Sequence, residues 1–253
     1  MDAERLLRVL DDEGRSLAAS ADGGDLTRPV WSCPGWTVGD LVAHLTAVYR
    51  WAALIVTESR TERPAPEERA ALDVPERDAP TLLDAFTTAH LSLLTALRSA
   101  PDDLACWTMW PAADPRYYWI RRQAHETLVH RVDAGNALAG AEADCPGVDP
   151  EVAADGVDEM VMGFANRYRD RLRSAKPVTL ALHATDADRR WWIRLGPGEP
   201  EFGRGGIDAP NATEVSARGG QLLLLLWNRR SWENLAVTGS DEPLRTWRHS
   251  AHV

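Results

Sequence analysis

Three side chains from two separate stretches of the sequence have the types and the spacing that suit a catalytic metal ion. They are His44, Glu126 and His130. A helix turns by about 100° per residue, so Glu126 and His130, four positions apart, lie on one helix face roughly 6 Å apart in height. Two neutral imidazoles and one carboxylate leave a bound Zn2+ with a net positive charge and a vacant fourth position. The pattern therefore predicts a zinc site that does chemistry, because purely structural sites are usually rich in thiolates.

A different zinc motif overlaps the same stretch. The residues from His125 to His130 superficially resemble the H-E-x-x-H motif of metalloproteases. His125 and His130 are five positions apart, however, which separates them by about 140° around a helix axis. One helix cannot direct both imidazoles at one metal without distortion. We therefore interpret Glu126 and His130 as the compatible pair and His125 as a cavity wall or a surface residue.

The composition excludes several classes of partner. The chain has 253 residues, enough for two modest domains, and 44% of them are hydrophobic and 26% charged. Its formal net charge of -10 argues against a nucleic-acid backbone or an anionic membrane, because both attract basic proteins. Aliphatic runs such as Leu222 to Leu226 are far too short to span a membrane. Three scattered cysteines and a charged N-terminal stretch without a signal-like segment favour a reducing cytoplasm.

The first half of the sequence has the periodicity of helices. Apolar residues recur at helical spacing over residues 2–20, and the Gly23-Gly24 pair ends this first helix. A second helix is expected after Thr37, because Thr37 and Asp40 have the spacing of a capping box. His44 lies on the apolar stripe of this helix, so we expect it to face the interior of a bundle.

Two further helices complete the predicted bundle. Residues 60–80 are rich in Pro, Glu and Arg and indicate a surface excursion. Thr81 and Asp84 then repeat the capping pattern and predict a third helix that stops before Pro101. A fourth helix is expected over residues 116–139.

One side of the fourth predicted helix is unusually polar for a bundle. It carries Trp119, Gln123, Glu126, His130 and Asp133. Metal sites in four-helix bundles are built in this way, from facing side chains of neighbouring helices. Asp133, three positions after His130, is a candidate to orient that imidazole, and an ion pair with an arginine is the equal alternative.

The second half has mixed character. Asp149-Pro150 predicts the start of a fifth helix that continues to about Arg173 and links the two halves. Beyond it the pattern predicts strands over residues 178–185, 190–195, 213–217 and 235–238, and helices over residues 219–230 and 243–249. The predicted fold class is a helical bundle over residues 1–147, followed by a smaller α+β domain over residues 148–253 with a short, mainly antiparallel sheet.

These residues also carry a family resemblance. The stretches Trp31 to Leu45 and Ala124 to Ala134 resemble the mycothiol-dependent maleylpyruvate isomerase family, whose N-terminal part is a DinB-like metal-binding four-helix bundle. The stretches Leu182 to Asp186 and Leu222 to Arg229 are similar to the C-terminal domain of that family. The resemblance covers nearly the whole chain.

The resemblance implies particular roles for residues. It implies that His44, Glu126 and His130 bind Zn2+ or another divalent metal. It also implies that Arg229 is a catalytic and cofactor-binding residue that helps to hold the thiol or the substrate. Asn228 stands where the family commonly has a glycine before this arginine, which leaves the local backbone shape open.

The implied activity is the activation of a thiol. Coordination to Zn2+ converts a thiol with a pKa near 8.5 into a thiolate. With mycothiol as the thiol cosubstrate, the thiolate would add to the cis double bond of a maleylpyruvate-type electrophile, allow rotation and leave again, which is an isomerisation. In a thiol S-transferase the conjugate would depart instead. We expect a small-molecule electrophile and a low-molecular-weight thiol as the partners, and a monomer or a homodimer.

Two functions of other classes remain compatible with the sequence. A metal-dependent hydrolase would use zinc-bound water and would need a general base, for which Asp133 and His125 are the candidates. A noncatalytic binding protein would use the C-terminal domain as a pocket and the metal only to stabilise the bundle. From the pattern alone, His44 is also compatible with a hydrogen-bonded core residue, and Cys33 is interpreted as a packing residue.

Overall fold

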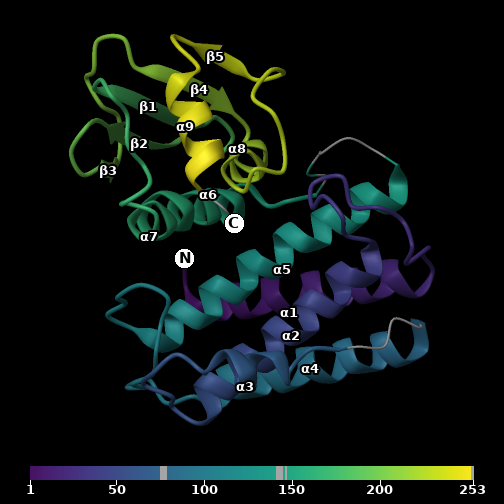
Figure 1. The fold of residues 1–253 in the computed structure, drawn as a ribbon. Coiled ribbons are helices and arrows are strands. Elements are labelled where there is room, and N and C mark those ends of the chain that lie inside the picture. The colour runs from purple at the N-terminus through teal and green to yellow at the C-terminus, as the bar shows by residue number, and fades with distance from the viewer. Residues whose placement is uncertain (75–78, 141–144, 146, 252–253) are drawn as a thin grey trace. The chain divides into compact units, whose positions relative to one another are not determined.

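The structure is a computed structural model, and it describes residues 1–74, 79–140, 145 and 147–251. The chain divides into two compact units, Met1–Glu142 and Ala143–Val253, which Figure 1 shows. The boundary predicted from the sequence lies a few residues later, between residues 147 and 148. The predicted fold class, a helical N-terminal part followed by a smaller α+β domain, is confirmed.

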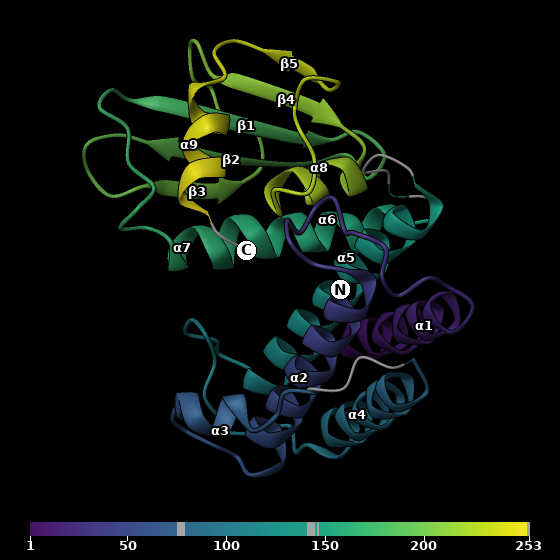
Figure 2. The ribbon, with the colours of Figure 1, turned by 45° about the vertical axis from the view of Figure 1, so that its right-hand side comes forward.

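The first unit consists of helices. Its long helices are α1 (Ala3–Asp22), α2 (Val38–Thr57), α4 (Ala79–Ser99) and α5 (Pro115–Ala139), and a short helix α3 (Pro66–Ala70) lies in the segment interpreted as a surface excursion. α1 packs against α5 and α4, and α2 packs against α4 and α5. Each long helix therefore has two main neighbours, which is the arrangement of a four-helix bundle (Figures 1 and 2).

Local capping signals fix the two helices that carry the candidate metal ligands. At the start of α2 the Thr37 hydroxyl accepts a hydrogen bond from the Asp40 backbone N–H at 3.2 Å, and the Asp40 carboxylate accepts one from the Thr37 N–H at 3.0 Å. This is the predicted capping box. α5 begins after Asp114, whose carboxylate accepts from the Tyr117 N–H at 2.8 Å, and it ends at Gly140 with φ 64°.

The predicted start of the third long helix is wrong. α4 begins at Ala79, so Thr81 lies inside its first turn and is not its N-cap. Pro80 explains the difference, because a proline in the first helical turn lacks only an N–H that has no partner there. The helix therefore starts three residues before Leu82, which would be its first residue if Thr81 were the N-cap.

The linking helix ends earlier than predicted. α6 (Pro150–Glu159) starts after Asp149 as expected, continues through a π-helical turn (Met160–Phe164) and ends with α7 (Ala165–Arg167). The predicted end near Arg173 is wrong, because the chain has already turned towards the sheet: the Ser174 N–H donates to the Gly196 carbonyl at 3.1 Å.

The second unit contains a five-stranded sheet. Its strands are β1 (Val178–Ala184), β2 (Arg189–Leu195), β3 (Glu201–Arg204), β4 (Thr213–Ala217) and β5 (Ala236–Thr238), in the order β3-β2-β1-β4-β5. Only the β1–β4 pair is parallel. Leu180, Leu182 and Ala184 alternate with more exposed residues, so one sheet face is buried. Helices α8 (Gly219–Leu226) and α9 (Glu242–Ser250) pack on β1.

β3 has no counterpart in the sequence prediction. It contains Gly203, and the ring of Trp192 on β2 lies so close that an added Cβ would come within 2.7 Å of it. This strand therefore depends on a cross-strand contact and not on a local β-type pattern. None of the described helices is long and apolar enough to cross a lipid bilayer.

Helix α8 also ends before the predicted residue 230. Its last residue is Leu226, and Asn228 has the left-handed backbone conformation, with φ 58°. A residue in this conformation ends a helix, and asparagine adopts it more readily than most non-glycine residues. The side chain of Asn228 donates to the Ala251 carbonyl at 2.6 Å. Asparagine therefore adopts here a turn conformation that glycine also favours.

Candidate metal centre

The three candidate ligands lie together in the first unit. His44 extends from α2, whereas Glu126 and His130 extend from α5, which packs against it. Nε2 of His44 lies 3.4 Å from Oε1 of Glu126, and Nε2 of His130 lies 3.3 Å from the same oxygen. The two imidazole rings are 5.2 Å apart between centroids. One carboxylate oxygen therefore faces both imidazoles.

These separations fit a single divalent cation. Ligand atoms about 2.0–2.1 Å from a zinc ion in tetrahedral geometry are roughly 3.3–3.4 Å apart from one another. The His44–Glu126 and His130–Glu126 distances of 3.4 and 3.3 Å match such edges. His44 keeps 29% of its side chain exposed, so the group is open on the His44 side. The donor set is the borderline nitrogen and oxygen set that zinc accepts.

Arg122 is a site residue that the sequence analysis did not identify. It precedes Glu126 by one helical turn, and its Nη2 donates to Oε2 of Glu126 at 2.6 Å. Burial by itself opposes ionisation of Glu126, but the Arg122 guanidinium and the hydrogen bonds from His130 and His44 hold the pKa of this carboxyl well below its usual range. Glu126 is therefore a carboxylate, as a metal ligand must be.

Asp133 contacts the other ring nitrogen of His130. Its Oδ2 lies 3.0 Å from Nδ1 of His130, and its Oδ1 accepts a hydrogen bond from the Ser32 hydroxyl at 2.5 Å. Burial lowers the pKa of His130, but its hydrogen bonds to Asp133 and Glu126 outweigh burial and raise the pKa above its usual value. With Nδ1 donating to Asp133, Nε2 of His130 faces Glu126 and His44.

Cys33 belongs to a second group that a metal could in principle occupy, together with His130 and Asp133. Its Sγ lies 3.8 Å from Oδ2 of Asp133. The 3.0 Å separation between His130 and Asp133 is shorter than a tetrahedral edge of about 3.3 Å and has the length of a hydrogen bond. We therefore interpret this group as a hydrogen-bond network.

The loop that carries Ser32, Cys33 and Trp36 contacts His44 directly and reaches His130 through Asp133. Asp133 links Ser32 to His130, and the ring of Trp36 lies 4.9 Å from the ring of His44, between centroids. No local signal in the sequence could have placed Ser32 beside Asp133, because 101 positions separate the two residues.

The polar stripe of α5 faces the interior. Trp119 is buried and its indole N–H donates to the Trp107 carbonyl at 3.0 Å. Gln123 is also buried, and its Oε1 has no hydrogen-bond partner among the described residues. His125 is fully buried, so its interpretation as a surface residue is wrong and its interpretation as the wall of a cavity stays a prediction.

Arg229 belongs to the second unit and follows α8. Its Nη1 donates to the Trp227 carbonyl at 2.9 Å, and its guanidinium lies over the Trp227 ring at 5.5 Å. Both contacts keep the side chain close to the end of α8.

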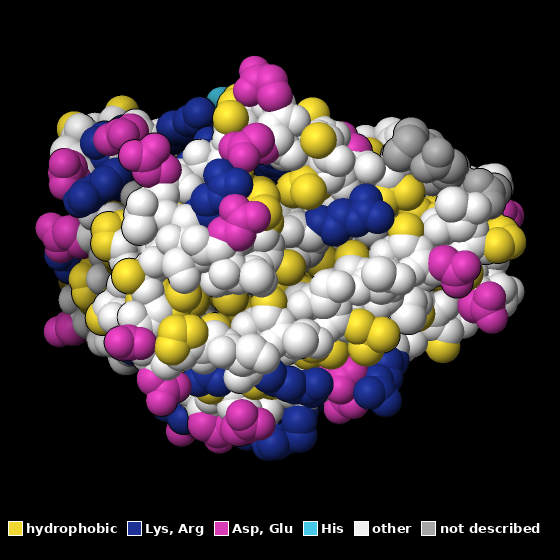
Figure 3. Space-filling model, turned by 90° about the horizontal axis from the view of Figure 1, so that it is seen from below, with side chains coloured by type: hydrophobic (Ala, Val, Ile, Leu, Met, Phe, Trp, Pro, Cys, Tyr) yellow, Lys and Arg dark blue, Asp and Glu magenta, His cyan; other side chains and the backbone are white. Residues whose placement is uncertain are grey.

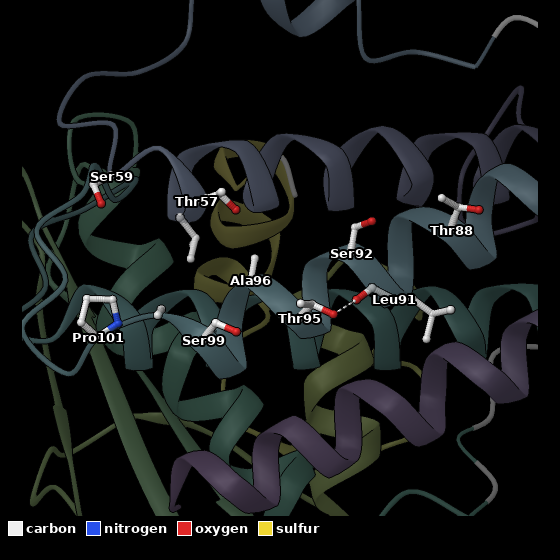
Figure 4. Close-up of a pocket in the computed structure, with 11 residues that line it drawn as sticks. Thr57, Ser59, Thr88, Leu91, Ser92, Thr95, Ala96, Ser99 and Pro101 are labelled. Atoms are coloured by element: carbon white, nitrogen blue, oxygen red, sulfur yellow. Dashed lines mark hydrogen bonds between the residues drawn. The ribbon is translucent and has the colours of Figure 1, made fainter.

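A hollow of about 650 Å³ lies between α2 and α4, away from these residues. Small and hydroxyl-bearing residues of both helices line it, including Thr57, Thr88, Ser92 and Thr95 (Figure 4). Among the described residues that line it, none is titratable and none is a candidate ligand. The space-filling view of Figure 3 shows hydrophobic side chains scattered among charged and uncharged ones. The described lining therefore offers hydroxyl groups but no acid, base or metal ligand to act with them.

Comparison with protein families covers both units. The family model for the mycothiol maleylpyruvate isomerase N-terminal domain matches residues 7–135, and the model for the MDMPI C-terminal domain matches residues 151–245. Among curated proteins, the sequence has no match.

Two solved structures have the same fold as this chain. One is a mycothiol-dependent maleylpyruvate isomerase in which a histidine is replaced by alanine, with a TM-score of 0.69 and 15% sequence identity. The other is a mycothiol-dependent maleylpyruvate isomerase with a TM-score of 0.65 and 16% identity. Each similarity covers 95% of this chain and 95% of the other. At such low identity the likeness shows the fold alone.

Proposed function

The chain belongs to the mycothiol maleylpyruvate isomerase family in both of its domains, and from this premise we propose that it is a metal-dependent enzyme that uses mycothiol as its thiol cosubstrate. The single observation that supports the metal is the meeting of His44, Glu126 and His130, whose ligand atoms all lie within 4.8 Å of one another. The two separations to Glu126 have the length expected between two ligands of one cation. Family membership supports mycothiol and a maleylpyruvate-type electrophile as the reactants.

The proposed ligand atoms are Nε2 of His44, Oε1 of Glu126 and Nε2 of His130. They would hold Zn2+ or another divalent metal and leave one position for the thiol. When bound, the cation lowers the pKa of a coordinated thiol, so that the thiolate forms at neutral pH. Asp133 keeps the Nδ1 proton of His130 engaged, so that Nε2 is the atom presented to the centre.

The proposed reaction is a reversible addition of the thiol. The thiolate sulfur forms a C–S bond to one carbon of the cis double bond, and the π electrons move onto the conjugated carbonyl group. The former double bond is now single and rotates. Return of the electrons breaks the C–S bond, restores the double bond in the trans form and regenerates the thiolate. In a thiol S-transfer the C–S bond would remain and the carbanion would take up a proton.

We propose that Arg229 holds an anionic group of the substrate or the thiol. A guanidinium presents several N–H donors in one plane and pairs well with a carboxylate. Its position after α8, at the end of the Leu222 to Arg229 motif, supports this role.

A hydrolase is the weaker alternative for this centre. It would need a general base next to the metal. Asp133 already accepts hydrogen bonds from Ser32 and from His130, and His125 is fully buried. Neither residue is placed to take a proton from water.

The proposal is tested by measuring metal content and turnover of the purified protein with mycothiol and maleylpyruvate. The His44→Ala variant should lose bound metal and thiol-dependent activity together, because one of three ligands is gone. His183→Ala, a histidine of β1 paired with Asp188, is the matched control and should keep both. Retained metal with unchanged turnover in His44→Ala would reject the assignment of His44. Conjugates in place of the trans isomer would identify an S-transferase.

A further inference from the structure

The two oxygens of Glu126 have different partners. Oε1 faces the imidazoles of His44 and His130 at 3.4 and 3.3 Å. Oε2 faces away from them to Arg122, whose Nη2 donates to it at 2.6 Å. A carboxylate can bind a cation through one oxygen or through both, and here the second oxygen is already engaged.

We propose that Arg122 is a positioning residue that restricts Glu126 to binding the cation through one oxygen and so keeps a position open for the thiol. This inference rests on the proposed function and concerns the same centre. Two imidazoles and one carboxylate oxygen occupy three of four tetrahedral positions and leave the fourth for water or the thiol. A carboxylate bound through both oxygens would add a further donor, so that the cation with its water becomes five-coordinate and the thiol has to compete with Oε2. Arg122 thus acts through Glu126 and does not itself contact the thiol.

The structure gives Arg122 little freedom to release Glu126. Its side chain is about 2% exposed, and the two residues are one turn apart on the same face of α5. The short N–H···O contact joins two opposite charges, and such hydrogen bonds are the strong ones. Moving Oε2 to the cation would leave a buried guanidinium without this carboxylate, which is unfavourable. The arginine therefore holds Glu126 through Oε2, the oxygen that is not the proposed ligand atom.

The exposure of the three candidate ligands also fits this proposal. Asp133 contacts Nδ1 of His130, and Arg122 contacts Oε2 of Glu126, which are not the proposed ligand atoms. His44 is the most exposed of the three side chains, at 29% against 16% for Glu126 and 3% for His130. The two less exposed side chains, Glu126 and His130, thus each have a partner outside the group of candidate ligands.

The proposal is tested on protein loaded with Co2+, whose visible absorption reports its coordination number. Visible absorption of Co2+ falls as its coordination number rises, so four-coordinate Co2+ absorbs more strongly than five-coordinate Co2+. The wild type should show the strong spectrum and gain a sulfur-to-cobalt charge-transfer band when mycothiol is added. In Arg122→Met, Glu126 should bind through both oxygens. The spectrum should then weaken, and the Kd for mycothiol from the charge-transfer band should rise at least tenfold.

The matched control is Arg131→Met on the same helix. Arg131 forms an equally direct ion pair with Glu13 of α1, but Glu13 is not a candidate ligand. This variant should keep the wild-type cobalt spectrum and mycothiol affinity even where it lowers stability. Arg122→Lys retains a charged donor, and it should restore much of the strong spectrum and the affinity. If the methionine variant does not fold, Arg122→Gln takes its place in the test, because its amide offers only a neutral hydrogen bond to Glu126.

Several results would overturn the proposal. A wild-type spectrum and wild-type mycothiol affinity in Arg122→Met would show that Glu126 keeps its orientation without the arginine. Loss of all bound cobalt in that variant would show a role in metal retention and not in coordination number. Failure of the proposed function itself looks different, because the wild type would then bind no cobalt at the centre or show no charge-transfer band with mycothiol.

Discussion

Asp133 joins two parts of the chain that are far apart in sequence. Its carboxylate accepts from the Ser32 hydroxyl through one oxygen and lies at hydrogen-bond distance from His130 through the other. A buried carboxylate is tolerated when such partners satisfy it. The orientation of His130 therefore depends on the loop before α2 as well as on α5. Two of the candidate ligands thus have a hydrogen-bonded partner: Asp133 for His130 and Arg122 for Glu126.

Arg229 allows the proposed roles of the two units to be tested separately. Arg229→Ala should lower kcat/KM for the thiol or the electrophile by roughly tenfold to a hundredfold, the usual effect of losing a hydrogen bond to a charged group. Metal content should stay at the wild-type level, because the three candidate ligands belong to the first unit. Steady-state kinetics and metal analysis of the same preparation measure both. Arg230→Ala is the neighbouring control, and loss of metal in Arg229→Ala would contradict the role.

The candidate site was predictable from the sequence only where spacing along one helix is informative. Glu126 and His130 share a face because they are four apart, and the same rule applied backwards would have found Arg122. Ser32 had no such signal, because its partner Asp133 is brought to it by the packing of the bundle. Whether the three candidate ligands bind a metal remains a prediction that the experiment with His44→Ala decides.

At the scale of elements, Asn228 controls how α8 ends. The N–H of Asn228 donates to the Leu225 carbonyl at 3.0 Å and that of Arg229 to the Leu224 carbonyl at 2.8 Å, while Asn228 itself is left-handed. These bonds satisfy carbonyls at the end of the helix. The conformation at Asn228 therefore sets the direction in which Arg229 leaves the helix.

Substitutions at Asn228 should separate backbone shape from side-chain bonding. Asn228→Gly keeps the left-handed turn at low steric cost and loses only the bond to Ala251, so the free energy of unfolding should fall by no more than about 1 kcal/mol. Asn228→Val places a β-branched residue in a left-handed conformation and should cost roughly 1–3 kcal/mol. Chemical denaturation of both variants measures the difference. Equal stability of the two would show that the turn does not constrain this residue.

The start of a helix could be predicted from the sequence where a few neighbouring residues determine it. The capping box at Thr37 and the N-caps at Asp114 and Asp149 each satisfy the first N–H groups of a helix, and all three helices start there. Thr81 had the same pattern and failed because a helix start at Ala79 was also allowed. β3 was missed because its pairing depends on the contact between Gly203 and Trp192, which a local pattern does not contain.

At the scale of the whole chain, the buried polar groups are concentrated in the helical unit. Tyr49 donates to the Thr127 hydroxyl at 2.7 Å, and that hydroxyl donates to the Gln123 carbonyl at 2.7 Å. Burial raises the pKa of Tyr49 well above its usual value, so it stays neutral. Tyr49 and Thr127 are tolerated in the interior because they are hydrogen-bonded. Where a buried group ionises, its titration couples the stability of the bundle to pH.

His90 should make the helical unit less stable as the pH falls. It lies buried on α4, with Nε2 3.1 Å from the Leu10 carbonyl of α1. Burial lowers the pKa of His90, and the hydrogen bond to Leu10 only partly opposes it. The unfolded chain therefore binds a proton near pH 6.5, whereas the folded protein binds it only at lower pH. The stability associated with neutral His90 is complete above about pH 6.5 and is lost as the pH falls towards the folded pKa.

We therefore expect the free energy of unfolding to fall between about pH 7 and about pH 5, with His90 contributing up to about 1.4 kcal/mol for each pH unit. In His90→Gln the amide can still donate to the Leu10 carbonyl but does not titrate, so this contribution should disappear. Denaturant unfolding of both proteins at the two pH values, at equal metal loading, measures it. Because the other histidines titrate equally in both, the difference between the two pH dependences isolates His90. Identical pH dependences would mean that His90 takes up its proton in the folded bundle as easily as in the unfolded chain.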